Sequence, residues 1–291
     1  MHKYLRAVGF SSLEKTADLN ILLSEVIKNY DCKKVVCTEK GMLFAEFSKE
    51  FASDCGIAVC GEYNEEGDFH IEYYFPYLSG SAISSTEDVI IERRADNEAY
   101  IGACDDMRLD ISLIFHLINT ADYLNSGKPG DQEFKSSAVS LSALCTDGKI
   151  LLPVLKTAET AKEKQKKLQK RSALITAAKN GDEEAIESLT VEDMDIYNEI
   201  SKRVNNEDIY SIIDNCFMPY GFGSDMYSVI GDIKDFSKEQ NRFTGETLVK
   251  MGIVCNDISL DVCINEKDLL GDPAVGRRFK GVIWLQGTVE F

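Results

Sequence analysis

One stretch decides the fold of the C-terminal part of the chain: Leu248-Val249-Lys250-Met251-Gly252-Ile253-Val254-Cys255-Asn256-Asp257-Ile258-Ser259-Leu260-Asp261-Val262-Cys263-Ile264-Asn265. In its second half, apolar residues at 258, 260, 262 and 264 alternate with Ser, Asp, Cys and Asn. This alternation is typical of a β-strand with one buried face, because successive side chains of a strand point to opposite sides. We therefore predict strands over 248–254 and 258–264.

Strands are also predicted on both sides of this stretch, over 227–233 and 281–291, with a helical turn at 267–270. Glycines that mark the bends stand at positions 245, 252, 271, 276, 281 and 287. Several short strands with glycine at the bends are typical of a small, sharply coiled sheet or barrel. Residues 216–291 are therefore predicted to form a small β-barrel-like module of the OB type.

Residues 1–155 are predicted to form an α+β domain. A short strand at 3–9 and a helix at 13–29 precede several segments rich in β-branched and aromatic residues. These segments are predicted to be strands of an antiparallel sheet, at 34–37, 42–47, 57–63, 69–75, 89–93 and 99–103. A helix over 107–124 and a hairpin with strands at 139–144 and 149–154 complete the domain.

The composition changes at Lys156, after which a run rich in Ala, Lys, Glu and Gln predicts a long helix. We predict that residues 156–215 are a helical connector between the two domains. Lys162, Lys166 and Lys170 recur four residues apart along this helix, which favours contact with the acidic remainder of the same protein or with a second copy of the chain. A solvent-facing helix without a partner is the alternative. The predicted fold class is α+β: an antiparallel sheet with packed helices, the connector and the C-terminal module.

The composition also argues against several classes of partner. The 291 residues carry a formal net charge of −17, which disfavours broad binding to nucleic acid or to anionic membranes. No apolar run approaches the roughly 20 residues that cross a bilayer. The nine cysteines are odd in number, include no C-x-x-C pair, and are predicted to be free thiols. We expect a cytoplasmic protein with no membrane partner, no metal and no cofactor.

The sharpest candidate site lies in the last predicted strand, where basic residues approach the single tryptophan. If the strand is continuous, Arg278, Lys280, Trp284 and Gln286 share one face, and Arg277 directly precedes them. Basic groups beside an indole form a platform for stacking and anion binding, as OB-like modules use for nucleotides or single strands. The alternative is a structural role, in which the arginine stems pack over apolar surface.

The second candidate is a polar cluster in the predicted strand 69–75. His70, Glu72 and Tyr74 fall on one strand face, and a carboxylate beside an imidazole could orient a general base. The sequence places no nucleophile nearby, so an ordinary solvated face is the alternative. His116 falls within the predicted helix 107–124 and is interpreted as a packed core histidine.

Three parts of the chain are distinctive: MHKYLRAVGFS at 1–11, IYSI and FMPYG at 209–212 and 217–221, and DLLGDPAVGRRFKGVIWLQG at 268–287. These stretches resemble a family of clostridial proteins catalogued as a domain of unknown function. The resemblance spans nearly the whole chain, and its closing motif is long enough to be specific. It implies a bacterial cytoplasmic protein and carries over no activity or catalytic residue.

The sequence contains no phosphate-binding loop and no metal or nucleophile motif of a known enzyme class. We therefore predict a non-enzymatic binding or adaptor protein that acts through Trp284 and its basic neighbours or through the connector. The alternative is an enzyme of another type with its site in the N-terminal domain, which requires a concave pocket holding acids or histidine. A third possibility is self-association through residues 156–215.

Overall fold

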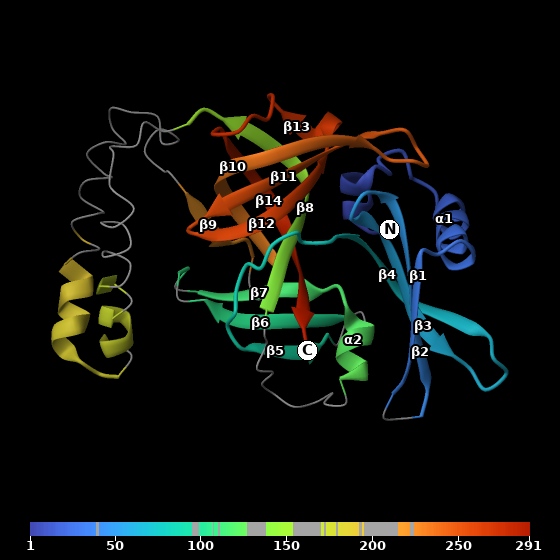
Figure 1. Cartoon of the computed structure of the whole chain (residues 1–291), viewed down its shortest axis with the longest axis horizontal. Coiled ribbons are helices and arrows are strands. Elements are labelled where there is room, and N and C mark those ends of the chain that lie inside the picture. The colour runs from blue at the N-terminus through green and yellow to red at the C-terminus, as the bar shows by residue number, and fades with distance from the viewer. Residues whose placement is uncertain are drawn as a thin grey trace.

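The computed structural model of the chain describes residues 1–38, 41–94, 99–106, 108–109, 111–126, 138–153, 170–171, 173–178, 180–191, 194, 215–221 and 224–291. Within these ranges the chain is mostly β, with few helices. An N-terminal sheet and a β-barrel with extra strands lie side by side (Figure 1).

The N-terminal sheet has four antiparallel strands in the order β1-β2-β3-β4. They are β1 (Cys32–Cys37), β2 (Leu43–Ala52), β3 (Cys55–Tyr63) and β4 (Phe69–Leu78). The 3-10 helix η1 (Lys3–Val8) and the helix α1 (Thr16–Lys28) pack against this sheet through their apolar residues. This arrangement confirms the predicted antiparallel N-terminal sheet and the helix predicted over 13–29.

The second sheet contains ten strands, five of which close into a mixed barrel. Its elements are β5 (Val89–Arg93), β6 (Tyr100–Asp106), β7 (Ile111–Leu117), β8 (Ala138–Leu151), β9 (Cys216–Pro219), β10 (Met226–Gln240), β11 (Thr247–Cys255), β12 (Ile258–Asn265), β13 (Leu269–Leu270) and β14 (Arg278–Glu290). The ring runs β8-β12-β11-β10-β14, and antiparallel pairing of β14 with β8 closes it. Strands β7, β6 and β5 extend the sheet from β14, and the short helices α2 (Thr120–Asn125) and η2 (Glu266–Asp268) lie between strands.

The alternation in 258–264 has the predicted effect. Ile258, Leu260, Val262 and Ile264 are buried in the barrel core. On the opposite face, Cys263 belongs to a second core that lies between the barrel and the N-terminal sheet. Trp284 of β14 joins that second core, whereas its neighbours Ile283 and Leu285 point into the barrel. The outer face of the barrel is therefore a packing surface for the N-terminal sheet.

Residues 3–9, predicted as a strand, instead form η1 and end at Gly9 in the left-handed conformation, with φ of 91°. The buried residues of η1 are Tyr4, Leu5, Ala7 and Val8, which do not alternate. This segment contacts β4, β8 and β12 at once. A helical turn directs side chains to several sides, whereas a strand serves only two, so the helix fits between the two sheets.

The helix predicted over 107–124 is also wrong. The described residues of this range form β7 and the six-residue helix α2. Strand β7 pairs with β6 on one side and with β14 on the other. A short apolar run such as ISLIFHL suits a buried strand as well as a buried helix, so partners distant in sequence decide its conformation.

The predicted hairpin at 139–144 and 149–154 is one continuous strand, β8. Its turn-like residues Thr146 and Asp147 stand opposite the single residue Val282 of β14, because Cys145 pairs with Ile283 and Gly148 with Gly281. Two residues against one form a β-bulge, which bends a strand without ending it. The bulge therefore occupies the position where the sequence indicates a turn.

The barrel draws on more of the chain than residues 216–291, because β8 is one of its five strands. The strands predicted over 89–93 and 99–103 exist as β5 and β6, but they belong to the barrel sheet and not to the N-terminal sheet. Most of the predicted connector 156–215 lies outside the described residues; within it, residues 173–178 and 183–191 are helical.

Candidate functional site

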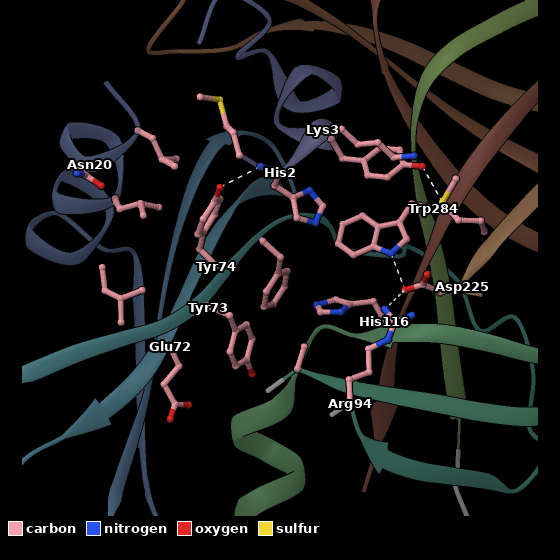
Figure 2. Close-up of a pocket in the computed structure, with 18 residues that line it drawn as sticks. His2, Lys3, Asn20, Glu72, Tyr73, Tyr74, Arg94, His116, Asp225 and Trp284 are labelled. Carbon is pink, nitrogen blue, oxygen red and sulfur yellow. Dashed lines mark hydrogen bonds and ion pairs between the residues drawn. The ribbon is translucent and has the colours of Figure 1, made fainter. Parts of the chain in front are cut away.

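A cavity of about 950 Å³ opens where the N-terminal sheet meets the barrel sheet (Figure 2). Strand β4, the edge of the N-terminal sheet, forms one wall, and residues of η1, α1, β7 and β14 form the others. The lining includes seven ring-bearing side chains: His2, Tyr4, Tyr73, Tyr74, Phe75, His116 and Trp284. Pockets of this size and largely apolar lining are typical small-molecule sites.

Trp284 is fixed in the wall by contacts on several sides. Its side chain is 5% exposed, and its ring stacks on Tyr4 with centroids 5.2 Å apart and planes 18° apart. The indole Nε1–H donates to Asp225 Oδ2 over 2.7 Å. Arg94 Nη1 donates to the same carboxylate oxygen over 3.1 Å. Asp225 thus holds the indole and the guanidinium beside each other at the cavity (Figure 2).

His116, on β7, lies at the floor of the cavity. Its ring lies 4.4 Å from that of Phe75 and 5.0 Å from that of Trp284, and the residue is 4% exposed. Among the described residues its buried Nε2 has no hydrogen-bond partner. Burial lowers the pKa of His116 to about 3, with smaller contributions from His2 and Arg94, so the imidazole is neutral at pH 7.

His2 approaches Trp284 from the other side, with ring centroids 4.7 Å apart. Its backbone N–H donates to the Tyr74 hydroxyl over 3.0 Å, which ties the segment before η1 to β4. The buried Nδ1 of His2 has no partner within the described chain. Burial, the amino terminus and Lys3 lower its pKa to about 4. Two neutral imidazoles therefore flank one indole.

The structure splits the predicted cluster of His70, Glu72 and Tyr74. Glu72 and Tyr74 line the cavity, whereas His70 is exposed and its Nε2 lies 3.2 Å from Nδ2 of Asn64. In β4, Tyr73 pairs with Cys60 and Ile71 with Gly61, so one extra residue interrupts the alternation. Because of this bulge, the strict alternation that would place His70 and Tyr74 on one face does not hold between them. Burial and Glu62 raise the pKa of Glu72.

The structure does not bring the basic residues Arg277, Arg278 and Lys280 to the cavity that Trp284 lines. Arg278 lies six positions along β14 from Trp284, roughly 20 Å at about 3.3 Å per residue, and it donates through Nε to Leu152 O. Arg277 donates to Asp272 O, and neither it nor Lys280 lines the cavity.

Gln286 has a structural position in β14. It donates to Pro76 O over 2.8 Å and accepts from Leu78 N over 3.1 Å, so it pairs with the edge of β4 as a neighbouring strand would.

The sequence pointed to Trp284, Glu72 and Tyr74, and it missed the other polar groups of the cavity. The sequence predicts that His116 is a core residue on a helix; it is buried, but it lies on a strand and lines a cavity. Arg94 and Asp225 lie 131 positions apart in sequence, and no local pattern links them. His2 stands in the distinctive opening MHKYLRAVGFS, which was the one available signal.

The described residues also lack two other features. They hold no group of three or more His, Cys, Asp or Glu side chains placed to bind a metal ion. Among the helices described, none is long and apolar enough to span a membrane.

The fold and the site define a mostly β protein with an aromatic cavity between a four-stranded sheet and a β-barrel sheet. The chain belongs to the family described as "Domain of unknown function, E. rectale Gene description (DUF3881)", whose model matches residues 5–287. This match confirms the resemblance to a clostridial family. Comparisons with curated proteins and with solved structures found no significant match.

Proposed function

We propose that this chain is a non-enzymatic binding protein whose ligand is a small, flat molecule held in the cavity at Trp284. One observation carries the proposal: the nine-tenths-buried His116 lines the cavity, and its Nε2 has no partner in the described chain. A buried polar atom that lacks a hydrogen bond costs about 1–3 kcal/mol. A ligand that bonds Nε2 removes this cost on binding, and the surrounding rings supply apolar contact area.

The shifted pKa values favour binding over catalysis. A general base works best when its pKa lies near the working pH. The pKa of His116 is about 3 and that of His2 about 4, so both imidazoles are weak bases that serve as neutral hydrogen-bonding groups. The described lining also contains no serine, threonine or cysteine that could act as a nucleophile.

An enzyme remains the second candidate, supported by a different observation. Glu72, whose pKa is raised, lines the same cavity as the two histidines. Carboxylates and histidines with shifted pKa values in one cleft are a frequent feature of active sites. An enzyme would consume its ligand, whereas a binding protein would return it unchanged.

The cellular setting is also part of the proposal. Nine free cysteines support a reducing compartment, so we place the protein in the cytoplasm. An adaptor role or self-association through residues 156–215 stays a prediction, because most of that segment lies outside the described residues. The likeness of the barrel to OB-type modules, and with it nucleotide binding, likewise stays a prediction.

Trp284 gives a direct test because it is the single tryptophan of the chain. We would titrate the protein with adenine, adenosine, 3-phenylpropionate, 3-phenylpropionamide and 3-phenylpropylamine, and record Trp284 emission and the melting temperature. At least one probe is expected to change both, and to be recovered unchanged after overnight incubation. His116→Phe should weaken that probe at least tenfold, whereas the exposed control His70→Phe should not.

Three results would overturn the proposal. The first is that no probe alters emission or melting, and native mass spectrometry finds no small molecule on the protein purified from its own organism. The second is equal weakening by His116→Phe and His70→Phe. Conversion of the bound probe would favour the enzyme instead.

A further inference from the structure

We propose that the ligand of this cavity is a small monocarboxylic acid with a flat apolar body, whose carboxylate binds at Arg94 and His116. This inference rests on the proposed binding function and names the chemical class of the ligand. Three features of the cavity support it: a guanidinium with further N–H donors, two neutral imidazoles and the distribution of charge around them.

The Arg94 guanidinium has N–H donors beyond the one that bonds Asp225. Its guanidinium carries five N–H groups in a planar fork that suits a carboxylate. Among the described residues, its side chain makes one hydrogen bond, from Nη1 to Asp225 Oδ2. The Arg94 side chain is 25% exposed and lines the cavity, where Figure 2 shows it beside His116. The remaining N–H groups can therefore bind a second carboxylate, one that belongs to a ligand.

The imidazoles complete an anion site. A neutral histidine carries one ring N–H donor, and a carboxylate offers several lone pairs to accept it. His116 lines the same cavity as Arg94, whose charge acts on its ring, and its buried Nε2 lacks a partner within the described chain. A carboxylate between the two would accept from the guanidinium and from His116 in the tautomer protonated at Nε2.

Charge around the imidazoles also favours an anion. The charged side chains that influence the pKa of these rings are Arg94 at His116 and Lys3 at His2, and both are cations. Asp225 already accepts from Arg94 and from the Trp284 indole, which offsets its charge. Lys3 and Arg94 act on the two imidazoles, whereas Glu72, the other carboxylate of the lining, lies on β4, in a chain whose net charge is −17. Local fields of this kind raise the affinity for anions.

The rest of the cavity restricts the shape and the charge of the part of the acid beyond its carboxylate. Rings of Phe75, Trp284 and Tyr74 and apolar side chains from α1 line the space beyond the floor, which suits a flat hydrocarbon body. Glu72 lines the cavity from β4, and its carboxylate would repel a second negative group. The cavity therefore favours an acid with one carboxylate over a diacid.

The test compares three probes of one shape and different charge: 3-phenylpropionate, its neutral amide 3-phenylpropionamide and the cationic 3-phenylpropylamine. Dissociation constants would be measured with wild-type protein by Trp284 fluorescence at low salt. The acid is expected to bind at least tenfold more tightly than the amide, and the amine most weakly. This ratio corresponds to loss of one charge-assisted hydrogen bond.

Variants of the protein show which residue causes the preference for the acid over the amide. Arg94→Gln should bring the ratio of acid to amide affinity close to one, and Arg94→Lys should retain part of it. Arg242→Gln removes the same charge from an exposed residue outside the cavity lining and should leave the ratio unchanged. Because the readout is a ratio within each variant, a general loss of stability does not imitate the result.

The outcomes separate the two proposals. Wild-type protein that binds the amide or the amine as tightly as the acid overturns the acid assignment and leaves the binding function standing. An acid preference that survives Arg94→Gln also overturns it. If none of the three probes binds, the acid assignment fails, and the nucleobase probes and native mass spectrometry decide the binding function separately.

Discussion

Glu46 provides a sharp test of the packing between β2 and α2. It lies on β2, is 8% exposed, and its Oε2 accepts a hydrogen bond from the Ala121 backbone N–H in α2 over 3.2 Å. The neighbouring Lys34 is paired with Asp122 over 2.8 Å. Burial raises the pKa of Glu46 from 4.5 to about 7. We expect Glu46→Gln, which keeps the shape and an acceptor oxygen, to remove a pH-dependent cost of folding.

The sign and size of this pH-dependent cost follow from the difference in proton affinity between the folded and the unfolded chain. The folded protein binds the Glu46 proton more tightly than the unfolded chain does, so stability falls as the pH rises from 4.5 through about 7. At about 1.36 kcal/mol per pH unit, the difference between these values corresponds to about 3 kcal/mol. The glutamine side chain of the variant does not ionise. The variant should therefore match wild type near pH 4.5 and be about 2–3 kcal/mol more stable at pH 8.

Urea denaturation followed by circular dichroism at pH 5, 6, 7 and 8 measures this difference. The control is Glu65→Gln, which removes the same charge from an exposed hairpin turn. Only the difference between variant and wild type is compared, because other carboxyl groups also titrate over this range. A stability difference for Glu46→Gln that is the same at pH 5 and pH 8, or an equal pH dependence for Glu65→Gln, would show that burial of Glu46 carries no such cost.

Three further predictions concern the cavity and the junction of the sheets. His116→Phe, which removes the unpartnered Nε2, should leave the free energy of unfolding unchanged or raise it by about 1 kcal/mol; a loss above that in urea denaturation would show that Nε2 has a partner. Gly61→Ala should lower the free energy of unfolding by roughly 1–3 kcal/mol, because a β-carbon there would lie 1.9 Å from the His70 backbone oxygen. An unchanged melting temperature would contradict the bulge in β4. Gln286→Leu should lower the free energy of unfolding by about 2–4 kcal/mol, since it leaves a backbone donor and a backbone acceptor of β4 unpaired. Hydrogen exchange at the Leu78 amide should become faster. Unaltered exchange there would show that Gln286 does not protect this amide.

Parts of the site could be read from the sequence and parts could not. The last strand was predicted with Trp284 on the face opposite Ile283 and Leu285, and the structure has them so. Arg278 and Lys280 were expected beside Trp284 because they share its strand face, but several residues of extended chain separate them from it. The cations that do accompany Trp284 are Arg94 and Lys3, which come from other segments. A strand face is a local property, whereas the neighbours across a cavity depend on how sheets pack.

Features that repeat along one element could be predicted from the sequence: the alternating strands of the barrel, the helix α1, the strands β1 to β4 and membership of the family. Each follows from side-chain periodicity or from a long specific motif, and needs no knowledge of the partner segment. The tertiary structure alone decided the conformation of residues 3–8, the strand β7, the bulges in β4 and β8, and the cavity with its unpartnered histidine. Those features depend on hydrogen-bond partners and packing surfaces far away in the chain, and a local sequence pattern does not predict these partners.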